Sequence, residues 1–390
     1  MSIALSILLG LIALWWALRF LPAGADGHGL MPYLIAFVRF LWIPSILILA
    51  VALVSRHWVV TIFAAILTIL TGIFASPWYR KKHSNQTRRE NPSKPPQNRE
   101  IQHTDNRYAV MTLNCRYGQA DPQAIIEAVS HNDVSILALQ ELTPNLVAAL
   151  GKAGMNALLP YCQLGKAQES DNGGFNGIFS RAQPDTQAGS TVDIAAADVP
   201  HCTINGVSVY SAHPKSPMRG CREWSRGIIN LAMLGPHSSG DSTSDTTSTV
   251  KSKTAESDDA SVVYDAGIPQ DGTDAESQDD TASQTGNSIN SIITQNGSAA
   301  NDIPSEAIIM GDLNSNLDHP SFRKLLDAGF EDAGLAASHG RAASFPQWLV
   351  WPRLELDHIL TTSGIRASNV HTLAIPGSDH FALLAQLARA

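Results

Sequence analysis

Long apolar stretches fill the beginning of the chain and do not recur later. Residues 3–22, 33–55 and 57–76 are each close to the roughly 20 residues that an α-helix needs to cross the hydrocarbon core of a bilayer. The first stretch lacks the basic residues that open a cleaved signal peptide, and two more apolar stretches follow it. We therefore predict that residues 1–78 form a membrane anchor of three transmembrane helices.

A basic, proline-rich segment follows at residues 79–105, with seven Lys or Arg. This composition is typical of a solvated linker that lies beside the membrane and meets anionic lipid headgroups; a nucleic-acid-binding arm is the alternative. By the positive-inside rule the charges favour a cytoplasmic C-terminal part. Two earlier basic residues, Arg19 and Arg39, lie near predicted helix ends, where long side chains reach the membrane interface.

Residues 106–390 alternate short apolar runs with polar turns. The runs predict strands at Tyr108–Leu113, Val134–Leu139, Gly177–Phe179, Val207–Ser211, Ala307–Met310, Leu356–Leu360 and Phe381–Leu387. Helical spacing predicts helices at Pro122–Ser130 and Ser321–Ala328. Some connections, such as the one before Val207, are too short for a helix, so we expect two packed sheets in a mixed α/β domain rather than one doubly wound parallel sheet.

A polar segment at about residues 236–305 interrupts this domain. It consists mainly of Ser, Thr, Asp, Gly and Asn, and such a segment buries too little apolar surface to fold, so we expect disorder. It contains twelve acidic residues and two lysines, a net charge of −10, whereas the whole chain carries −8. The remainder is therefore near neutral, at about +2, and its net charge shows no strong nucleic-acid footprint.

The chain has four cysteines, Cys115, Cys162, Cys202 and Cys221. They have neither CxxC spacing nor a companion cluster of metal ligands, which argues against a zinc site. Their even number permits disulfides without requiring them, so the cysteines do not identify the redox compartment.

Five short motifs occur in order along the domain, and a sixth stands just before the last of them. They place polar residues capable of chemistry beside the predicted strands. The candidates are Asn114, Arg116, Glu141, His213, Asp312, Asn314, Asp357, Asp379 and His380. Carboxylate and amide oxygens suit Mg²⁺ or Mn²⁺, a guanidinium binds phosphate with two hydrogen bonds, and imidazoles move protons or stabilise phosphoryl charge. Together they predict metal-assisted attack of water on a phosphorus ester or anhydride.

Each motif also has a structural explanation when it stands alone. Asp312 and Asn314 are suited to orienting water and holding a phosphoryl oxygen, but the same spacing is common in Asx turns. Asp357 is a candidate to fix the tautomer of His380 and to raise the pKa of its charged form. A single His213 is more often structural, and Glu141 alone is an ordinary loop residue, so the prediction depends on the set.

In this order the motifs resemble the endonuclease/exonuclease/phosphatase superfamily, over roughly residues 106–235 and 306–390. The resemblance implies a four-layered α/β/β/α sandwich of the DNase I type. It implies that Asn114 and Glu141 bind a divalent metal, with Asp379 at the metal or the water, and that Asp312 activates water. It further implies that Asn314 holds the phosphate, that His213 is a second catalytic imidazole, and that His380, oriented by Asp357, stabilises the transition state or handles a proton.

Two departures from the abasic-site endonucleases of this superfamily weaken a DNA-repair function. Arg116 stands where those enzymes have an acidic metal ligand, and Leu142-Thr143 replaces their usual Thr-Lys. Three membrane helices before the domain, and the segment from His213 to Pro217, look more like a membrane-tethered bacterial branch. Some members of that branch are associated with glycopeptide resistance and are thought to act on a polyprenyl pyrophosphate.

We therefore expect a multi-pass, Mg²⁺-dependent membrane phosphohydrolase that acts on a lipid-linked phosphate or pyrophosphate, with the bilayer and this substrate as its partners. A membrane-tethered nuclease and a catalytically silent membrane scaffold are the alternatives. Nothing in the sequence indicates a protein partner. The charge rule favours a cytoplasmic domain and the resemblance an extracytoplasmic one, so its side stays open. Trp348 and Trp351 either border the site, touch lipid or simply pack an apolar loop.

Overall fold

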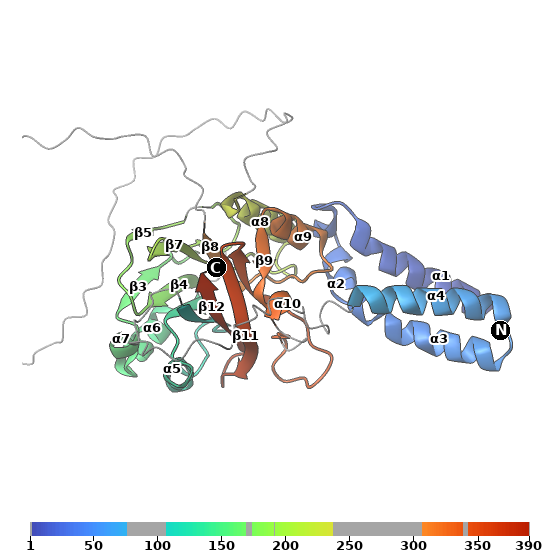
Figure 1. Cartoon of the computed structure of the whole chain (residues 1–390), viewed down its shortest axis with the longest axis horizontal. Helices are drawn as coiled ribbons and strands as arrows, with labels where there is room; N and C mark the ends of the chain where they lie inside the picture. Colours follow the sequence, from blue (N-terminus) through green and yellow to red (C-terminus); the bar gives the residue numbers. More distant parts are fainter. Residues whose placement is uncertain are drawn as a thin grey trace, which may run out of the picture. The chain divides into compact units, whose positions relative to one another are not determined.

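The structure is a computed structural model that describes residues 2–75, 107–168, 174–190, 192–236, 306–337 and 342–389. The part described within residues 107–389 is built on two six-stranded sheets (Figure 1). The first has the strand order β11-β12-β1-β2-β4-β3. Its strands are β1 (Arg107–Asn114), β2 (Ile136–Leu142), β3 (Tyr161–Leu164), β4 (Phe175–Ser180), β11 (Ile365–Ala374) and β12 (Phe381–Arg389).

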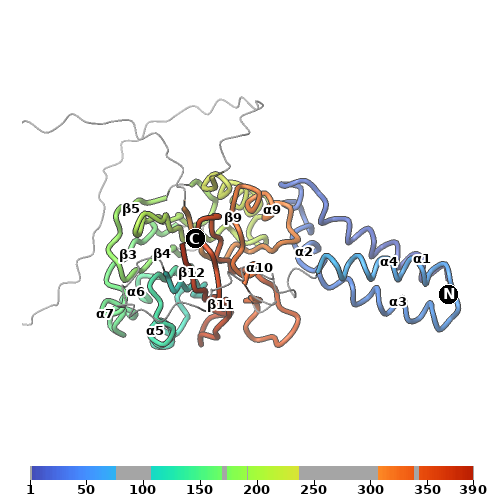
Figure 2. Tube along the Cα trace, viewed as in Figure 1, coloured from blue at the N-terminus to red at the C-terminus, as the bar shows by residue number. Residues whose placement is uncertain are grey.

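The second sheet has the order β5-β6-β7-β8-β10-β9. Its strands are β5 (Thr186–Ala188), β6 (His201–Ile204), β7 (Val207–Ser211), β8 (Ala307–Asp312), β9 (Phe330–Asp332) and β10 (Asp357–Thr362). Strands β1 and β2 run parallel, as do β7 and β8, whereas β12 returns antiparallel beside β1. The last two strands, β11 and β12, lie side by side (Figure 2). The parallel pairs place the ends of β1, β2, β7 and β8 together, and these ends carry the candidate site.

The two sheets pack face to face and helices cover their outer faces. Side chains alternate across a strand, so Ile136 and Ala138 of β2 enter the core between the sheets, whereas Leu137 enters the core beneath the helices. Helices α5 (Pro122–His131), α6 (Pro144–Lys152) and α7 (Met155–Leu158) supply that outer core, and α8 (Cys221–Leu231) and α9 (Pro320–Asp327) supply a third core on the second sheet. The predicted four-layered α/β/β/α sandwich is confirmed.

All seven predicted strands are present, but the sequence pattern missed β3, β5, β6, β9 and β11, together with α6, α7, α8 and the short α10 (Ala333–Ala337). Four of the missed strands lie at the edges of the sheets. An edge strand buries fewer of its side chains, and all three residues of β5 are exposed, so its apolar pattern is weak. The predicted end of β2 at Leu139 was also wrong, because the strand continues to Leu142 through a bulge.

The N-terminal part contains α1 (Ser2–Ala17), α2 (Met31–Ala36), α3 (Trp42–Val54) and α4 (Trp58–Ala75), with 3₁₀ turns η1 (Leu18–Phe20), η2 (Ala25–Gly27) and η3 (Val38–Phe40). In the described residues, two helices are long and apolar enough to span a membrane, at Ser2–Phe20 and Trp58–Ala75.

The second predicted helix, at residues 33–55, is broken in the structure. That stretch breaks into Met31–Phe40 and Trp42–Val54, bent by 57°, and counts as a third span only if the bent pair is taken as one. Pro44 lies in the first turn of α3, and its ring would clash with the carbonyl of Phe40 in a continuous helix. The first part of the predicted helix therefore ends at Phe40, and α3 begins in a new direction at Trp42.

Asp26, in the turn after the first apolar helix, is fully buried against the sandwich. Its carboxylate accepts a hydrogen bond from the backbone N–H of Ser321 at 2.8 Å and from the hydroxyls of Ser321 and Ser225. Helix α9 has no side-chain cap from its own N-cap residue, His319. Asp26 therefore caps the first turn of α9 from 295 residues away in the sequence.

Two arginines of the N-terminal part are buried in ion pairs with the sandwich. Arg19 lies 3.1 Å from the carboxylate of Asp318, and Arg39 pairs with both Asp318 and Glu355. All four side chains are less than a tenth exposed. Because a buried charge is stable only with a partner, these pairs join the anchor to two loops, one after β8 and one before β10.

The four cysteines form no disulfide in the described part of the chain. Cys115 and Cys202 are buried, whereas Cys162 is exposed. The predicted linker at residues 79–105 and almost all of the predicted insert at 236–305 lie outside the described residues.

Candidate active site

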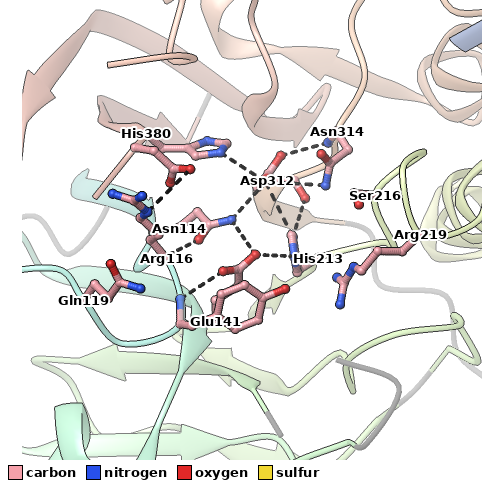
Figure 3. Close-up of a pocket in the computed structure, with 12 residues that line it drawn as sticks. Asn114, Arg116, Gln119, Glu141, His213, Ser216, Arg219, Asp312, Asn314 and His380 are labelled. Carbon is pink, nitrogen blue, oxygen red and sulfur yellow. Dashed lines mark hydrogen bonds and ion pairs between the residues drawn. The ribbon is translucent and has the colours of Figure 1, made fainter. Parts of the chain in front are cut away.

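The predicted site residues come from both sheets and meet where inner strands of the two sheets end (Figure 3). A pocket with a volume of about 210 Å³ is lined by eight of them, namely Asn114, Arg116, Glu141, His213, Asp312, Asn314, Asp379 and His380. The ninth, Asp357, is buried directly behind His380. Residues up to 266 positions apart in the sequence therefore form one polar cavity. No single motif would require such a cavity.

Glu141 lies within β2, not after it as the sequence pattern predicted. The strand is irregular between Leu139 and Leu142, and Glu141 has a positive φ of 52°, so the bulge turns its side chain into the pocket. Its carboxylate accepts hydrogen bonds from the Asn114 amide at 3.2 Å and the Tyr117 N–H at 2.9 Å, and lies 3.2 Å from His213 Nε2.

The charge on Glu141 is strongly stabilised. Burial by itself would raise the pKa of this carboxyl, but the hydrogen bond and charge of His213, together with the Asn114 and Tyr117 donors, lower the pKa to about 2. Glu141 is therefore a carboxylate at every physiological pH. A permanently ionised oxygen donor in a pocket is suited to a hard divalent cation.

Asp312 ends β8 at the centre of the cluster and is 1% exposed. One of its oxygens accepts a hydrogen bond from the Asn114 amide at 3.0 Å and lies 3.7 Å from a nitrogen of both His213 and His380. Burial raises the pKa of Asp312, and the nearby charge of Asp357 acts in the same direction, against the two imidazoles. A carboxylate with increased proton affinity is a better base toward water.

The glycine before Asp312 has a structural reason. Gly311 has φ of 153°, and a Cβ there would meet the carbonyl oxygen of Ala212 at 1.8 Å. Only glycine allows β8 to come this close to the segment that leads to His213. The Asx turn weighed from the sequence is also present, because the Asn314 N–H donates to Asp312 at 2.9 Å.

His380 and Asp357 form the predicted pair. Nδ1 of His380 lies 2.7 Å from the Asp357 carboxylate, and both side chains are buried. Burial favours the neutral imidazole, but Asp357 and Asp312 outweigh it and raise the pKa of His380 to about 10. His380 is therefore an imidazolium at neutral pH, which favours stabilisation of phosphoryl charge or donation of a proton over service as a base.

Arg116 and Asp379 lie at the more exposed rim of the pocket. Their side chains are 48% and 25% exposed, and the Arg116 guanidinium lies 3.9 Å from the Asp379 carboxylate. This pair is loose enough to be exchanged for an incoming phosphate or cation, since an exposed ion pair contributes little to stability.

Four further lining residues were missed by sequence reasoning: Tyr117, Gln119, Ser216 and Arg219. Arg219 follows His213 by six residues and adds a second guanidinium to the pocket. A basic residue so soon after His213 is the sequence signal that could have identified it. Ser378 also escaped notice, although its hydroxyl bonds to the carbonyl of Asn114 at 2.7 Å and accepts from the His380 N–H at 2.9 Å. It fixes the His380 segment against the end of β1.

A second grouping in the same place would also suit a cation. Asp312, Asp357 and His380 each offer a ligand atom, and these atoms lie within 4.8 Å of one another. In the described state the His380–Asp357 hydrogen bond occupies one nitrogen of that imidazole. The trio thus joins a hydrogen-bonded histidine–aspartate pair to a third carboxylate, that of Asp312.

A four-layered sandwich that gathers carboxylates, imidazoles and guanidinium groups in one pocket has the groups that hydrolysis of a phosphoester bond requires. The chain belongs to the Endonuclease/Exonuclease/phosphatase family, whose model matches residues 111–380. That range contains all nine predicted site residues. The resemblance inferred from the ordered motifs is thereby confirmed at the level of the family.

Solved structures match the chain at low sequence identity. A humanized TDP2 of D. rerio with 14 mutations is 13% identical, covers 72% of this chain and 98% of its own, and has a TM-score of 0.44. An AP endonuclease from Archaeoglobus fulgidus is 14% identical over 71% and 98%, with a TM-score of 0.42. An endonuclease/exonuclease/phosphatase family protein from Leptotrichia buccalis is 11% identical over 73% and 99%, with a TM-score of 0.43. No curated protein matches the sequence.

Proposed function

We propose that the chain is a membrane-anchored, Mg²⁺-dependent phosphohydrolase of a lipid-linked phosphate or pyrophosphate. One observation carries the proposal: the loops that bear the pocket residues are held by buried ion pairs to the turns between apolar helices. Asp318, in the loop after Asp312 and Asn314, pairs with Arg19, and Glu355, just before Asp357, pairs with Arg39. A site built into an anchor in this way is suited to substrates that are confined to the bilayer.

The pocket fits a divalent cation. Glu141 is held ionised, and Asp379 and Asp312 place two more carboxylates around the same cavity. Asn114 turns its amide nitrogen, not its oxygen, toward Glu141 and Asp312, so it joins a metal shell only after the amide turns over. When bound, Mg²⁺ would polarise a phosphoryl oxygen and offset the negative charge that builds up in the reaction.

The protein groups divide the remaining work. Asp312, with its raised proton affinity, is placed to accept a proton from the attacking water. The His380 imidazolium, held by Asp357, donates to a phosphoryl or leaving oxygen, while Asn314 contributes an amide donor from the same rim. Arg116 and Arg219 line the pocket and provide guanidinium groups suited to a further phosphate.

Anchoring favours a lipid-linked substrate over a soluble one. A pyrophosphate on a lipid chain already diffuses within the bilayer, so tethering the enzyme there raises the local concentration that the pocket meets. Arg116 and Arg219 provide for a second phosphate beside the one that is attacked, which supports a pyrophosphate in particular.

The substrate class is tested by comparing two substrates under one condition. The purified full chain in detergent micelles with Mg²⁺ is given a polyprenyl pyrophosphate and, separately, supercoiled plasmid DNA. We expect phosphate release from the lipid and little nicking of the plasmid. Efficient plasmid cleavage with an intact lipid would replace this proposal by a membrane-tethered nuclease, and failure on both together with all other phosphoesters would favour the silent scaffold.

A further inference from the structure

A short loop beside the pocket exposes four apolar residues in a row. Trp348, Leu349, Val350 and Trp351 have exposed fractions of 66%, 39%, 90% and 60%. The loop is closed at its base by a bridge between Phe345 and Leu354. Trp348 and Trp351 each pack one ring neighbour, Phe345 and Phe40, so packing of an apolar loop, one of the interpretations weighed from the sequence, accounts for only part of their surface. A contiguous exposed apolar run is uncommon on a water-facing surface and indicates contact with something apolar.

The base of this loop is tied to the catalytic groups. The Gln347 N–H donates to the carbonyl of Asp379 at 2.7 Å, and its side-chain amide donates to the carbonyl of His380 at 3.1 Å. The ring of Phe345 lies 4.8 Å from the imidazole of His380, centre to centre. The base of the loop therefore lies directly against the segment that carries Asp379 and His380.

The far end of the loop is tied to the anchor. The ring of Trp351 packs edge-on against Phe40, with 5.6 Å between ring centres. Phe40 ends η3, immediately before the apolar helix α3 begins at Trp42. The ring of Phe37, which is 42% exposed, lies 6.1 Å from that of Phe40. Apolar rings therefore continue from the N-terminal helices through Phe40 to the loop.

We infer that residues 348–351 insert into the interfacial layer of the lipid bilayer and form the edge over which a lipid-linked substrate enters the pocket. Tryptophan is the side chain most suited to this layer, because an apolar ring and a polar N–H are satisfied there together. The continuity with the anchor identifies the bilayer, not a second protein, as the occupant. Entry of a lipid substrate rests on the proposed function, whereas insertion of the loop does not.

Insertion is tested with a probe on the loop of the full chain. In a background with Cys162→Ser and Cys221→Ser, which leaves the buried Cys115 and Cys202, Val350→Cys is labelled with an environment-sensitive fluorophore. The protein is reconstituted into phosphatidylcholine and phosphatidylglycerol vesicles with or without a headgroup-region nitroxide lipid. We expect a blue-shifted emission that the nitroxide quenches. Gln187→Cys, on the exposed strand β5, is the matched control and should show neither effect.

Two results would overturn the inference. A label at position 350 that behaves like the one at 187 would place the loop in water. A blue shift without quenching would show that a second copy or another protein covers the loop. Neither result depends on catalysis, so a chain that proves inactive on lipid-linked pyrophosphate still decides the question of insertion.

The entry role is tested by a ratio of activities. For Trp348→Ser with Trp351→Ser, we expect kcat/KM on a bilayer-embedded polyprenyl pyrophosphate, divided by kcat/KM on a short water-soluble analogue, to fall by roughly tenfold, or about 1.4 kcal/mol. Met233→Ser, another exposed apolar residue, is the control and should keep the ratio of the unmodified chain. An unchanged ratio in the tryptophan variant would refute the entry role and leave the proposed hydrolysis standing.

Discussion

Two adjacent residues of β10 take part in two separate buried histidine–aspartate pairs. Asp357 holds His380 at the pocket, whereas His358 turns the other way and pairs with Asp332. Both pairs are buried, and the His358 pair also engages the carbonyl of Ser315 at 2.8 Å. The two pairs have the same chemistry, and only the His380 pair reaches the cavity described for this part of the chain. They form a natural comparison between a catalytic and a structural arrangement.

Replacing Asp357 by Asn should reduce kcat by between about 10²- and 10⁴-fold. The substitution keeps the shape but removes the charge that favours the His380 imidazolium. Asp332→Asn is the matched control, since it removes the same charge from the His358 pair and should lower the thermal midpoint while keeping kcat. Equal losses of kcat in both variants would mean that Asp357 acts through folding alone.

The metal assignment is tested at Glu141. Because Glu141→Gln removes a permanently ionised ligand, the Mg²⁺ concentration for half-maximal activity should rise by at least about tenfold, with activity returning at high Mg²⁺. Treatment of the unmodified chain with a chelator should abolish hydrolysis until Mg²⁺ is restored. A Glu141→Gln chain with an unaltered Mg²⁺ titration would remove this residue from the metal site.

At the scale of elements, α9 is completed by a residue of the N-terminal part, Asp26. Its first turn begins at Pro320, whose preceding residue, His319, supplies no side-chain cap. Nε2 of His319 instead lies 2.9 Å from the carbonyl of Pro32, and Asn316 donates to the carbonyl of Ala36 at 3.3 Å. The loop after Asp312 is thus bonded to the anchor at several points, and Asp26 provides the cap of the helix.

Asp26→Ala should destabilise the sandwich by about 2 kcal/mol, because it removes a helix cap and the carboxylate to which two buried serine hydroxyls donate. For a domain of this size we expect the thermal midpoint in detergent to fall by roughly 4–8 °C. Asp193→Ala, which removes an exposed carboxylate, should leave the midpoint in place. A midpoint unaffected by Asp26→Ala would show that the anchor does not support the sandwich through this residue.

We predict that the insert at about residues 236–305 is not required for folding or hydrolysis. The helical segment that precedes it ends at Leu234 with η6 (Ala232–Leu234), and β8 resumes at Ala307 inside the sheet. Replacing residues 237–305 by a short Gly/Ser linker should leave circular dichroism and hydrolysis intact, since the entropy of a loop depends only weakly on its length. Loss of folded protein or of turnover in the shortened chain would give the insert a role in the fold or the site.

At the scale of the whole molecule, the sequence predicted most of the site residues but few of the contacts that hold them in place. Asn114 and Asp312 end strands whose apolar runs are plain, so their meeting at one edge follows from the sheets. Tyr117 and Arg219 reach the pocket along loop paths, with a positive φ of 51° at Tyr117, and no periodic pattern encodes such a path. The contact of Asp26 with α9 depends on tertiary structure alone, so an acidic residue between apolar helices gave no signal of it.

We propose that the pocket around Asp312 hydrolyses a substrate held in the membrane. The most direct measurement is phosphate release from polyprenyl pyrophosphate in proteoliposomes with Mg²⁺, by the unmodified chain and by Asp312→Asn at equal amounts of folded protein. We predict steady release by the unmodified chain and a loss of between about 10²- and 10⁴-fold in the variant, because its amide no longer accepts a proton from water. Equal release by both chains would contradict the account.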